Sequence, residues 1–169
     1  MELWTVGYGA WPAANRAERL VGALSGRGVN LVVDVRLNPS GSDVDPSRPY
    51  GPRPWSLQPG RGGIVALLND AGIAYEWAVE LGNPQRKDRA MAILRHHLAD
   101  PGGDWPVQRG LARLASRIAT PGAVVALLCA CDDGRACHRA VIARAVSDRH
   151  FGGTLIAREV RAGRQSNQA

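Results

Sequence analysis

The stretch Ala123-Val-Val-Ala-Leu-Leu-Cys129 gives the clearest indication of the fold. It is an unbroken apolar run that leads into a polar loop, and a helical pattern follows from Ala140 to Val146. A second run, Leu31-Val-Val-Asp-Val35, is rich in β-branched residues and follows an earlier helical pattern. Runs without alternating polar residues are typical of strands that are buried on both faces of a parallel sheet.

The segments around these two runs repeat the order of strand and helix. Asn15 and Glu18 have the spacing of a capping box, which predicts the start of the first helix. Strands are predicted at 3–7, 31–35, 73–77, 123–129 and 154–156, and helices at 15–28, 64–69, 86–98, 107–119 and 140–146. Strands that alternate with helices indicate βαβ units with right-handed crossovers. The expected fold is an α/β, Rossmann-like three-layer sandwich with a mostly parallel sheet.

The domain organisation follows from the length and from two irregular segments. A chain of 169 residues fits a single domain, which we place at residues 1–157. Residues 38–63 are rich in proline and glycine and predict a long loop, which in a compact domain is usually functional or mobile. The polar residues 158–169 are expected to form a disordered tail.

Composition and the amino-terminal residues indicate where the chain acts. The longest apolar run covers nine residues, 123–131, whereas a membrane span needs roughly 20. The first residues show no basic segment followed by an apolar stretch, so no secretory signal is expected. Three cysteines, all within 129–137, do not fit a secreted disulfide framework. We therefore expect a soluble, cytoplasmic protein with no membrane association.

The positive charge favours a negatively charged partner. The formal net charge is +6, and residues 101–169 hold ten basic and five acidic side chains. Nucleic acid and phosphorylated small molecules are partners of the corresponding charge. Because 20 of the 21 basic residues are arginine, base composition of the genome offers another explanation of the bias.

Four segments are expected to meet at the carboxyl edge of the sheet. In parallel α/β sheets, ligands bind beyond this edge, where the order of the strands reverses. The segments that this rule gathers are Gly7-Tyr8-Gly9, Asp34-Val35-Arg36, Glu80-Leu-Gly-Asn83 and Cys129 to Arg139.

The segment from Cys129 to Arg139 is the strongest candidate site. It joins the best strand to the start of a helix, where free backbone N–H groups bind anions. We predict that Arg36, His138 and Arg139 bind the phosphate of a nucleotide or nucleic acid at this edge. Asp34 or His138 would be the acid–base group if the ligand is also modified or hydrolysed. The remaining predicted ligand-binding residues are Gly7, Tyr8, Arg135 and Cys137, and Trp11 and Trp55 could stack on a base.

Asp34 and Arg36 share one face of a buried strand end. Asp34 could act as a base, bind a ribose hydroxyl or pair with Arg36. The last alternative is a purely structural ion pair.

The cysteines allow two further hypotheses. Cys129 and Arg135 have the Cys-x5-Arg spacing of cysteine-dependent phosphatases, and rhodanese-type sulfurtransferases use a similar cradle, so Cys129 is a candidate nucleophile. Two aspartates in the loop would repel phosphate, and a cysteine inside a strand can be inert. Zinc ligation by the cysteines and His138 is conceivable, but the paired CxxC spacing is absent, so no metal or cofactor is predicted. A third hypothesis is an interaction module without catalysis.

Several short motifs resemble the family called domain of unknown function 488. They are Thr5-Val-Gly-Tyr8, Val33-Asp-Val-Arg36, Gly72-Ile-Ala-Tyr75, Leu81-Gly82, Leu127-Leu-Cys-Ala130 and Cys137-His-Arg139. The resemblance runs from about Leu3 to Ile156 and implies a Rossmann-like domain whose Asp-Val-Arg and Cys-His-Arg elements line one pocket. It implies no activity, although members are discussed near nucleic-acid metabolism. Relatives usually have Cys-Ala-Glu at 129–131 and Leu-Gly-Gly at 81–83, so Cys131 and Asn83 are departures.

Overall fold

The computed structural model of the chain describes residues 1–12, 15–37, 63–85 and 88–162. The predicted loop at 38–63 lies outside the described residues except for its last position, and so do Trp55 and residues 163–169.

Within the described residues, five strands form one sheet in the order β3-β2-β4-β1-β5, and every pair of neighbours is parallel. The strands are β1 (Glu2–Gly7), β2 (Leu31–Asp34), β3 (Ala74–Trp77), β4 (Val125–Cys129) and β5 (Ile156–Val160). The apolar run that ends at Cys129 forms the central strand, with β2 on one side and β1 on the other. All five residues of β4 are buried, as its continuous apolar pattern predicts.

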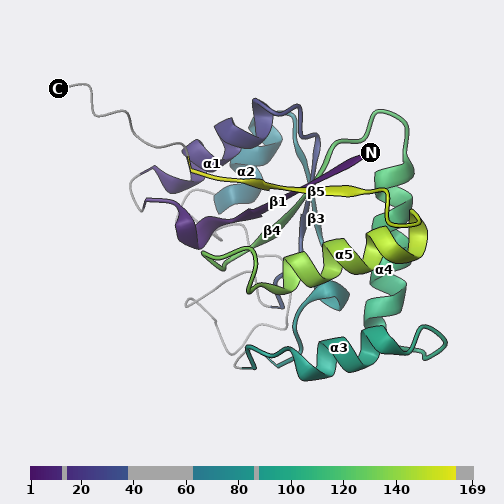
Figure 1. Cartoon of the computed structure of the whole chain (residues 1–169). Helices are drawn as coiled ribbons and strands as arrows, with labels where there is room; N and C mark the ends of the chain where they lie inside the picture. The colour runs from purple at the N-terminus through teal and green to yellow at the C-terminus, as the bar shows by residue number, and fades with distance from the viewer. Residues whose placement is uncertain (13–14, 38–62, 86–87, 163–169) are drawn as a thin grey trace.

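Helices cover both faces of the sheet and complete a three-layer sandwich (Figure 1). On one face lie α1 (Arg16–Ser25) and α2 (Gly63–Asp70), and on the other α3 (Ala92–Ala99), α4 (Pro106–Ala119) and α5 (His138–His150). Side chains of β4 alternate between the two cores: Leu127 packs with α3, α4 and α5, while Leu128 packs with α1 and α2. The α/β, Rossmann-like prediction is confirmed.

The connections after β1, β2 and β4 place a switch point at the end of β4. The chain leaves β1 and β2 toward helices on one face, and it leaves β4 toward α5 on the other face. Because β4 lies between β1 and β2, the loop after β4 diverges from the loops after both neighbours, next to Cys129. A crevice at such a point is where parallel α/β sheets bind ligands.

Two predicted element boundaries and one predicted helix cap are wrong. α3 begins at Ala92 rather than at residue 86, because the Asp88 carboxylate accepts the backbone N–H groups of Ala90 and Ala92 and closes a separate turn. α5 runs from His138 to His150, beyond the predicted 140–146. Asn15 lies at the start of α1 in a left-handed conformation (φ 49°) and makes no side-chain cap, so the capping box does not form.

The last strand is also displaced from its predicted position. It covers Ile156–Val160 instead of 154–156, so the predicted domain boundary at residue 157 falls inside β5. β5 has one neighbour, β1, and most of its side chains are exposed. Charged residues are common in edge strands. Because Arg158 and Glu159 are charged, the sequence of β5 resembled the polar tail that follows it.

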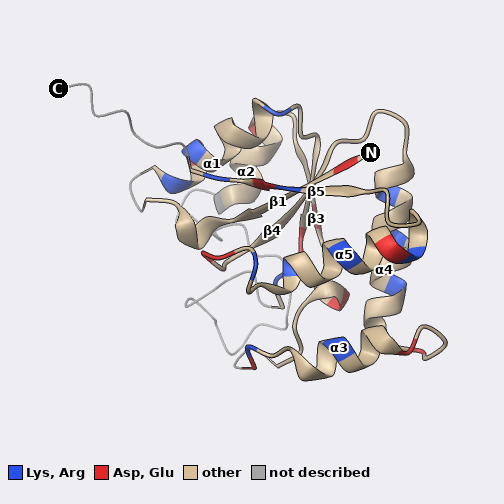
Figure 2. Cartoon of the chain, in the orientation of Figure 1, with Lys and Arg blue, Asp and Glu red and all other residues tan. Residues whose placement is uncertain are grey.

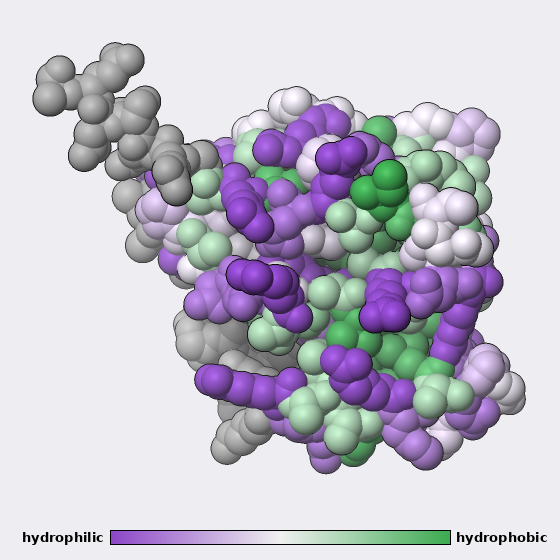
Figure 3. Space-filling model, in the orientation of Figure 1, coloured by the Kyte–Doolittle hydropathy of each residue, from purple (hydrophilic) through white to green (hydrophobic). Residues whose placement is uncertain are grey.

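The surface is mixed in character. Met1 and Ile156 are the large hydrophobic residues that are exposed in the described part of the chain, and the face in Figure 3 carries hydrophilic and hydrophobic residues side by side. No helix in the described part is both long and apolar enough to cross a membrane.

Candidate functional site

A cavity of about 490 Å³ opens at the switch point, at the carboxyl end of β4. We call it the switch-point cavity. Its walls come from the segments after β1, β2 and β3, and its floor comes from the end of β4 and the start of α5. The lining residues are Tyr8, Arg36, Leu37, Asn83, Asp88, Arg89, Met91, Cys129, Ala130, Cys131, Ala136, Cys137 and His138.

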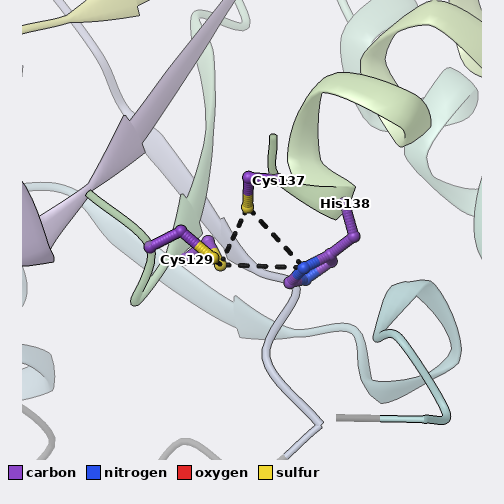
Figure 4. A group of neighbouring side chains, drawn as sticks. Cys129, Cys137 and His138 are labelled. Carbon is purple, nitrogen blue, oxygen red and sulfur yellow. Dashed lines mark hydrogen bonds between the residues drawn. The ribbon is translucent and has the colours of Figure 1, made fainter. Parts of the chain in front are cut away.

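Four residues on the floor form a compact cluster of sulfur and nitrogen atoms. The Sγ atoms of Cys129, Cys131 and Cys137 and a ring nitrogen of His138 all lie within 4.8 Å of one another. Figure 4 shows Cys129, Cys137 and His138 pointing toward a common centre. The Sγ of Cys129 is 3.5 Å from that of Cys131 and 3.2 Å from that of Cys137. The Nδ1 of His138 is 3.8 Å from the Sγ of Cys129 and 3.7 Å from that of Cys137.

Secondary structure holds these side chains in place. Cys129 is the last residue of β4, and Cys137 is the N-cap of α5, with extended backbone angles (φ −115°, ψ 146°). His138 is the first residue of that helix, and its Nε2 lies 2.8 Å from the carbonyl oxygen of Val35. A carbonyl only accepts hydrogen bonds, so Nε2 carries a proton and donates it. His138 therefore turns Nδ1 toward the three sulfur atoms.

The cluster shifts the pKa values of its own members. Hydrogen bonds from the thiols of Cys131 and Cys137 lower the pKa of Cys129 against the opposing effect of burial, and His138 lowers it further. The same hydrogen bonds raise the pKa values of Cys131 and Cys137. Burial would lower the pKa of His138, but hydrogen bonds with Cys129 and Cys137 raise it to about 10. These shifts favour negative charge on the sulfur of Cys129 and positive charge on the ring of His138.

The loop that carries Cys131 packs against the end of β1. The backbone N–H of Gly9 donates to the carbonyl oxygen of Ala130 at 3.1 Å. A Cβ atom on Gly7 would lie 1.9 Å from the carbonyl oxygen of Cys131. Gly7, a predicted ligand-binding residue, does not line the switch-point cavity but allows this close approach.

Arg139 lies beneath the cluster and not in the cavity. Its side chain is fully buried, donates to Glu159 of β5 at 2.7 Å and donates to the carbonyl oxygen of Cys131 at 3.3 Å. The guanidinium of Arg139 is thus close enough to act on the charge of Cys131, and its hydrogen bond supports the loop that carries Cys131. The predicted contact of Arg139 with phosphate would require this buried ion pair to open.

Asp34 and Arg36 form a buried ion pair at the end of β2. The Arg36 guanidinium donates to both carboxylate oxygens, and the hydroxyl of Tyr75 donates to Oδ2 at 2.7 Å. Burial opposes the charge on Arg36, but Asp34 raises its pKa and keeps it a cation. Asp34 does not line the cavity, whereas Arg36 does, with its guanidinium 5.3 Å from the ring centroid of Tyr8.

Arg135 and Cys129 do not surround a common space. The Arg135 side chain is 96% exposed and lines a different cavity, of about 750 Å³, beside α5 and β5. Asp132 and Asp133 line that second cavity too. Cys129 itself is only 2% exposed. The Cys-x5-Arg cradle is therefore not assembled, and Trp11, at 3% exposure, is part of the core rather than an open stacking surface.

Sequence reasoning missed three residues of this region. Arg89 lines the cavity from the segment before α3, where the chain shows no motif. Tyr75 ends the Gly-Ile-Ala-Tyr motif, but nothing in the local pattern points to Asp34 as its partner. Glu159 falls in the predicted tail, and the only signal that could have found it is the buried Arg139 that it neutralises.

Comparison with known proteins identifies a family. The family model described as Domain of unknown function DUF488 matches residues 61–146, which are 86 of the 169 residues. The match includes α2, β3, α3, α4, β4 and the first part of α5, and so the entire cysteine and histidine cluster. No curated protein and no solved structure matches the chain.

Proposed function

The chain belongs to the family Domain of unknown function DUF488, whose name assigns no activity, and we propose that this member binds a phosphate-bearing nucleotide in the switch-point cavity. The nucleotide can be free or a single nucleotide of a nucleic-acid chain. The observation that carries the proposal is a cavity at the switch point whose walls bear Arg36 and Arg89 and whose floor is the start of α5.

The groups around the cavity suit an anion. Arg36 is held in a fixed orientation by Asp34 and Tyr8, and Arg89 is exposed on the opposite segment. α5 presents its amino-terminal end, which carries a partial positive charge, to the floor. Tyr8 offers a ring edge, and Asn83 an amide, for the less charged parts of a ligand.

The size and the charge distribution favour a small ligand over a long duplex. A cavity of about 490 Å³ is in the range of small-molecule sites. In the described part of the chain, Figure 2 shows arginines spread over several elements with acidic residues between them. A duplex is held mainly by phosphate contacts along an extended basic surface. A nucleic acid would accordingly enter the cavity with one nucleotide or one end.

The other two hypotheses have less support. A thiol-dependent phosphatase needs its nucleophile and its arginine in one cradle, whereas Cys129 is buried and Arg135 lines the other cavity. The hypothesis of an interaction module without catalysis does not explain why Arg36, Arg89 and His138 all line one cavity.

Fluorescence anisotropy tests the proposal with labelled ATP and with labelled single-stranded DNA and RNA over a series of salt concentrations. We expect binding that weakens as salt rises, because arginine–phosphate contacts are electrostatic. Arg89→Ala should weaken binding about tenfold, the effect of losing one charge-assisted hydrogen bond.

Arg109→Ala is the matched control. Arg109 is also exposed and also an arginine, but it lies on α4, pairs with Asp104 and does not line the cavity. The control should keep the affinity of the unaltered protein. Failure of every probe to bind at low salt, or an equal loss in both variants, would rule out a nucleotide in this cavity.

A further inference from the structure

We propose that Cys129, Cys131, Cys137 and His138 bind one zinc ion in a closed tetrahedral site at the floor of the switch-point cavity. The site goes beyond the nucleotide proposal and does not depend on it. The four residues are too irregularly spaced in the sequence to predict a metal site, and the fold brings them together.

The distances within the cluster fit tetrahedral zinc. Zn–S bonds of about 2.3 Å and Zn–N bonds of about 2.0–2.1 Å at tetrahedral angles place two sulfur ligands about 3.8 Å apart and a sulfur and a nitrogen about 3.6 Å apart. The Sγ atom of Cys129 lies 3.5 and 3.2 Å from those of Cys131 and Cys137, and Nδ1 of His138 lies 3.8 and 3.7 Å from those of Cys129 and Cys137. Small movements of the side chains would centre an ion among all four atoms.

The type of the ligand set also indicates zinc. Three cysteines and one histidine form one of the common structural zinc sites, in which the protein supplies all four ligands. Thiolate ligands select zinc over hard cations such as magnesium and calcium. A disulfide explains the arrangement of the sulfur atoms less well than a metal site does. The Sγ atoms of Cys129 and Cys137 are 3.2 Å apart, whereas an S–S bond is about 2.05 Å long.

His138 is oriented as a ligand. The Nε2–H donates to the carbonyl oxygen of Val35, which fixes the ring and directs Nδ1 at the sulfur atoms. A hydrogen bond from the second ring nitrogen to a carbonyl is the usual arrangement of a zinc-bound histidine, because it sets the tautomer and the ring orientation.

The surroundings stabilise the charge that such a site would carry. Zinc binding forms three Zn–S bonds and one Zn–N bond, and any protons held by the three sulfur atoms and by Nδ1 pass to solvent. Three thiolates exceed the charge of the ion by one negative charge. The buried cation of Arg139 donates to the carbonyl oxygen of Cys131, and the amino-terminal end of α5 points at the cluster.

The fold places the backbone of the four residues around one point. Cys129 ends the buried strand β4, and Cys137 and His138 begin α5. Gly7 and Gly9 let the loop of Cys131 lie directly on the end of β1. Cys129 and Cys137 are 2% and 1% exposed, so a metal would be closed off from solvent on their side and face the cavity at Cys131 and His138.

The first test measures the metal in the unaltered protein, purified under reducing conditions without chelator from cells supplied with zinc. Mass spectrometry of the metals should find about one zinc per chain, and a mercurial thiol reagent should release it. After replacement by Co²⁺, the visible spectrum should show the intense bands of tetrahedral cobalt and the charge-transfer band of cobalt thiolate.

Two ligand variants and one matched control locate the ion. Cys131→Ser and His138→Gln should each lower zinc affinity more than about a hundredfold, since even indirect supports of a metal site contribute 10–100-fold. His150→Gln changes an exposed histidine at the far end of α5 and should bind zinc like the unaltered protein. Circular dichroism of each variant shows whether it is folded.

The proposal is overturned if the reduced, folded protein holds far less than one zinc and Co²⁺ gives no tetrahedral thiolate spectrum. Iron in place of zinc, a disulfide without metal, or undiminished affinity in folded Cys131→Ser would overturn it as well. Metal content is read separately from nucleotide binding, so failure of one proposal is distinguishable from failure of the other.

Discussion

At the scale of single residues, the centre of the buried polar network is the carboxylate of Asp34. It is fully buried, pairs with Arg36 and accepts the hydroxyl of Tyr75. Removal of one partner from such a pair leaves an uncompensated charge in the protein interior. The described contacts of Asp34 hold Arg36 at the cavity wall, and its part in proton transfer stays a prediction.

Tyr75 should make the stability of the protein depend on pH in alkaline solution. Burial raises the pKa of Tyr75, and the negative charge of Asp34 raises it further, so the folded protein retains the phenol proton. The unfolded chain loses that proton above its ordinary pKa of about 10, and the folded state then binds more protons than the unfolded state. The free energy of unfolding must fall as pH rises through this range.

The expected result is a difference between the unaltered protein and Tyr75→Phe. From about pH 10 to pH 11 the unaltered protein should lose about 1 kcal/mol more stability than the variant, which has no phenol proton. Urea unfolding at the two pH values measures this difference. Parallel losses in both proteins would show that Tyr75 does not retain its proton.

At the scale of elements, the decisive contact is the one between the end of β1 and the loop that follows β4. Gly7 pairs with Cys129, and a Cβ on Gly7 would lie 1.9 Å from the carbonyl oxygen of Cys131 and 2.5 Å from Nη1 of Arg139. The φ angle of Gly7 is −120°, which any residue can adopt, so the requirement for glycine is steric alone.

Gly7→Ala should lower the free energy of unfolding by about 3 kcal/mol, the upper range for overpacking, because the clash is with backbone. It should also lower zinc content, since the loop must move and take Cys131 with it. Urea unfolding and metal analysis measure the two effects.

Gly22→Ala is the control for this substitution. Gly22 lies inside α1, is exposed, and has no neighbouring atom within 4 Å of the point that an added Cβ would occupy. The same chemical change should raise stability there by about 0.5–1 kcal/mol, because alanine favours the helix. If Gly7→Ala were as stable as this control, the close approach at Gly7 would be refuted.

At the scale of the whole molecule, β5 completes the sheet and the support of the site. It pairs with β1 along five residues, and Glu159 neutralises the buried Arg139 and accepts the hydroxyl of Thr5 at 2.6 Å. Val160 adds to the core beneath α1 and α2. The strand therefore links the edge of the fold to the loop that carries Cys131.

A chain that ends at Ala157 should be less stable than one that ends at Ala162 by about 3–5 kcal/mol, the effect of leaving a buried charge unpaired. Both chains omit residues 163–169, so the comparison isolates the last three residues of β5 and the two that follow. Thermal and urea unfolding give the difference. If the two chains unfolded at the same temperature and the same urea concentration, residues 158–162 would not contribute to the stability of the domain, as the predicted boundary at residue 157 implies.

The sequence by itself determined the class of fold and the edge of the sheet at which the candidate site lies. Runs such as 123–129, which is continuously apolar, and 31–35, which is interrupted only by Asp34, are typical of strands buried on both faces by helices on both sides of a parallel sheet. Parallel strands then place their carboxyl ends together, and with them Tyr8, Arg36 and Cys129. These inferences depend on local patterns, which a sequence displays directly.

Only the tertiary structure decided which side chains act together. Cys129 could have been an inert buried residue, a nucleophile or a ligand, and its local sequence is the same in each case. Arg135 is six positions away and lines another cavity, whereas Val35 is 103 positions from His138 and fixes its ring. Distances between side chains depend on how strands and helices pack, and residues far apart in the chain set that packing.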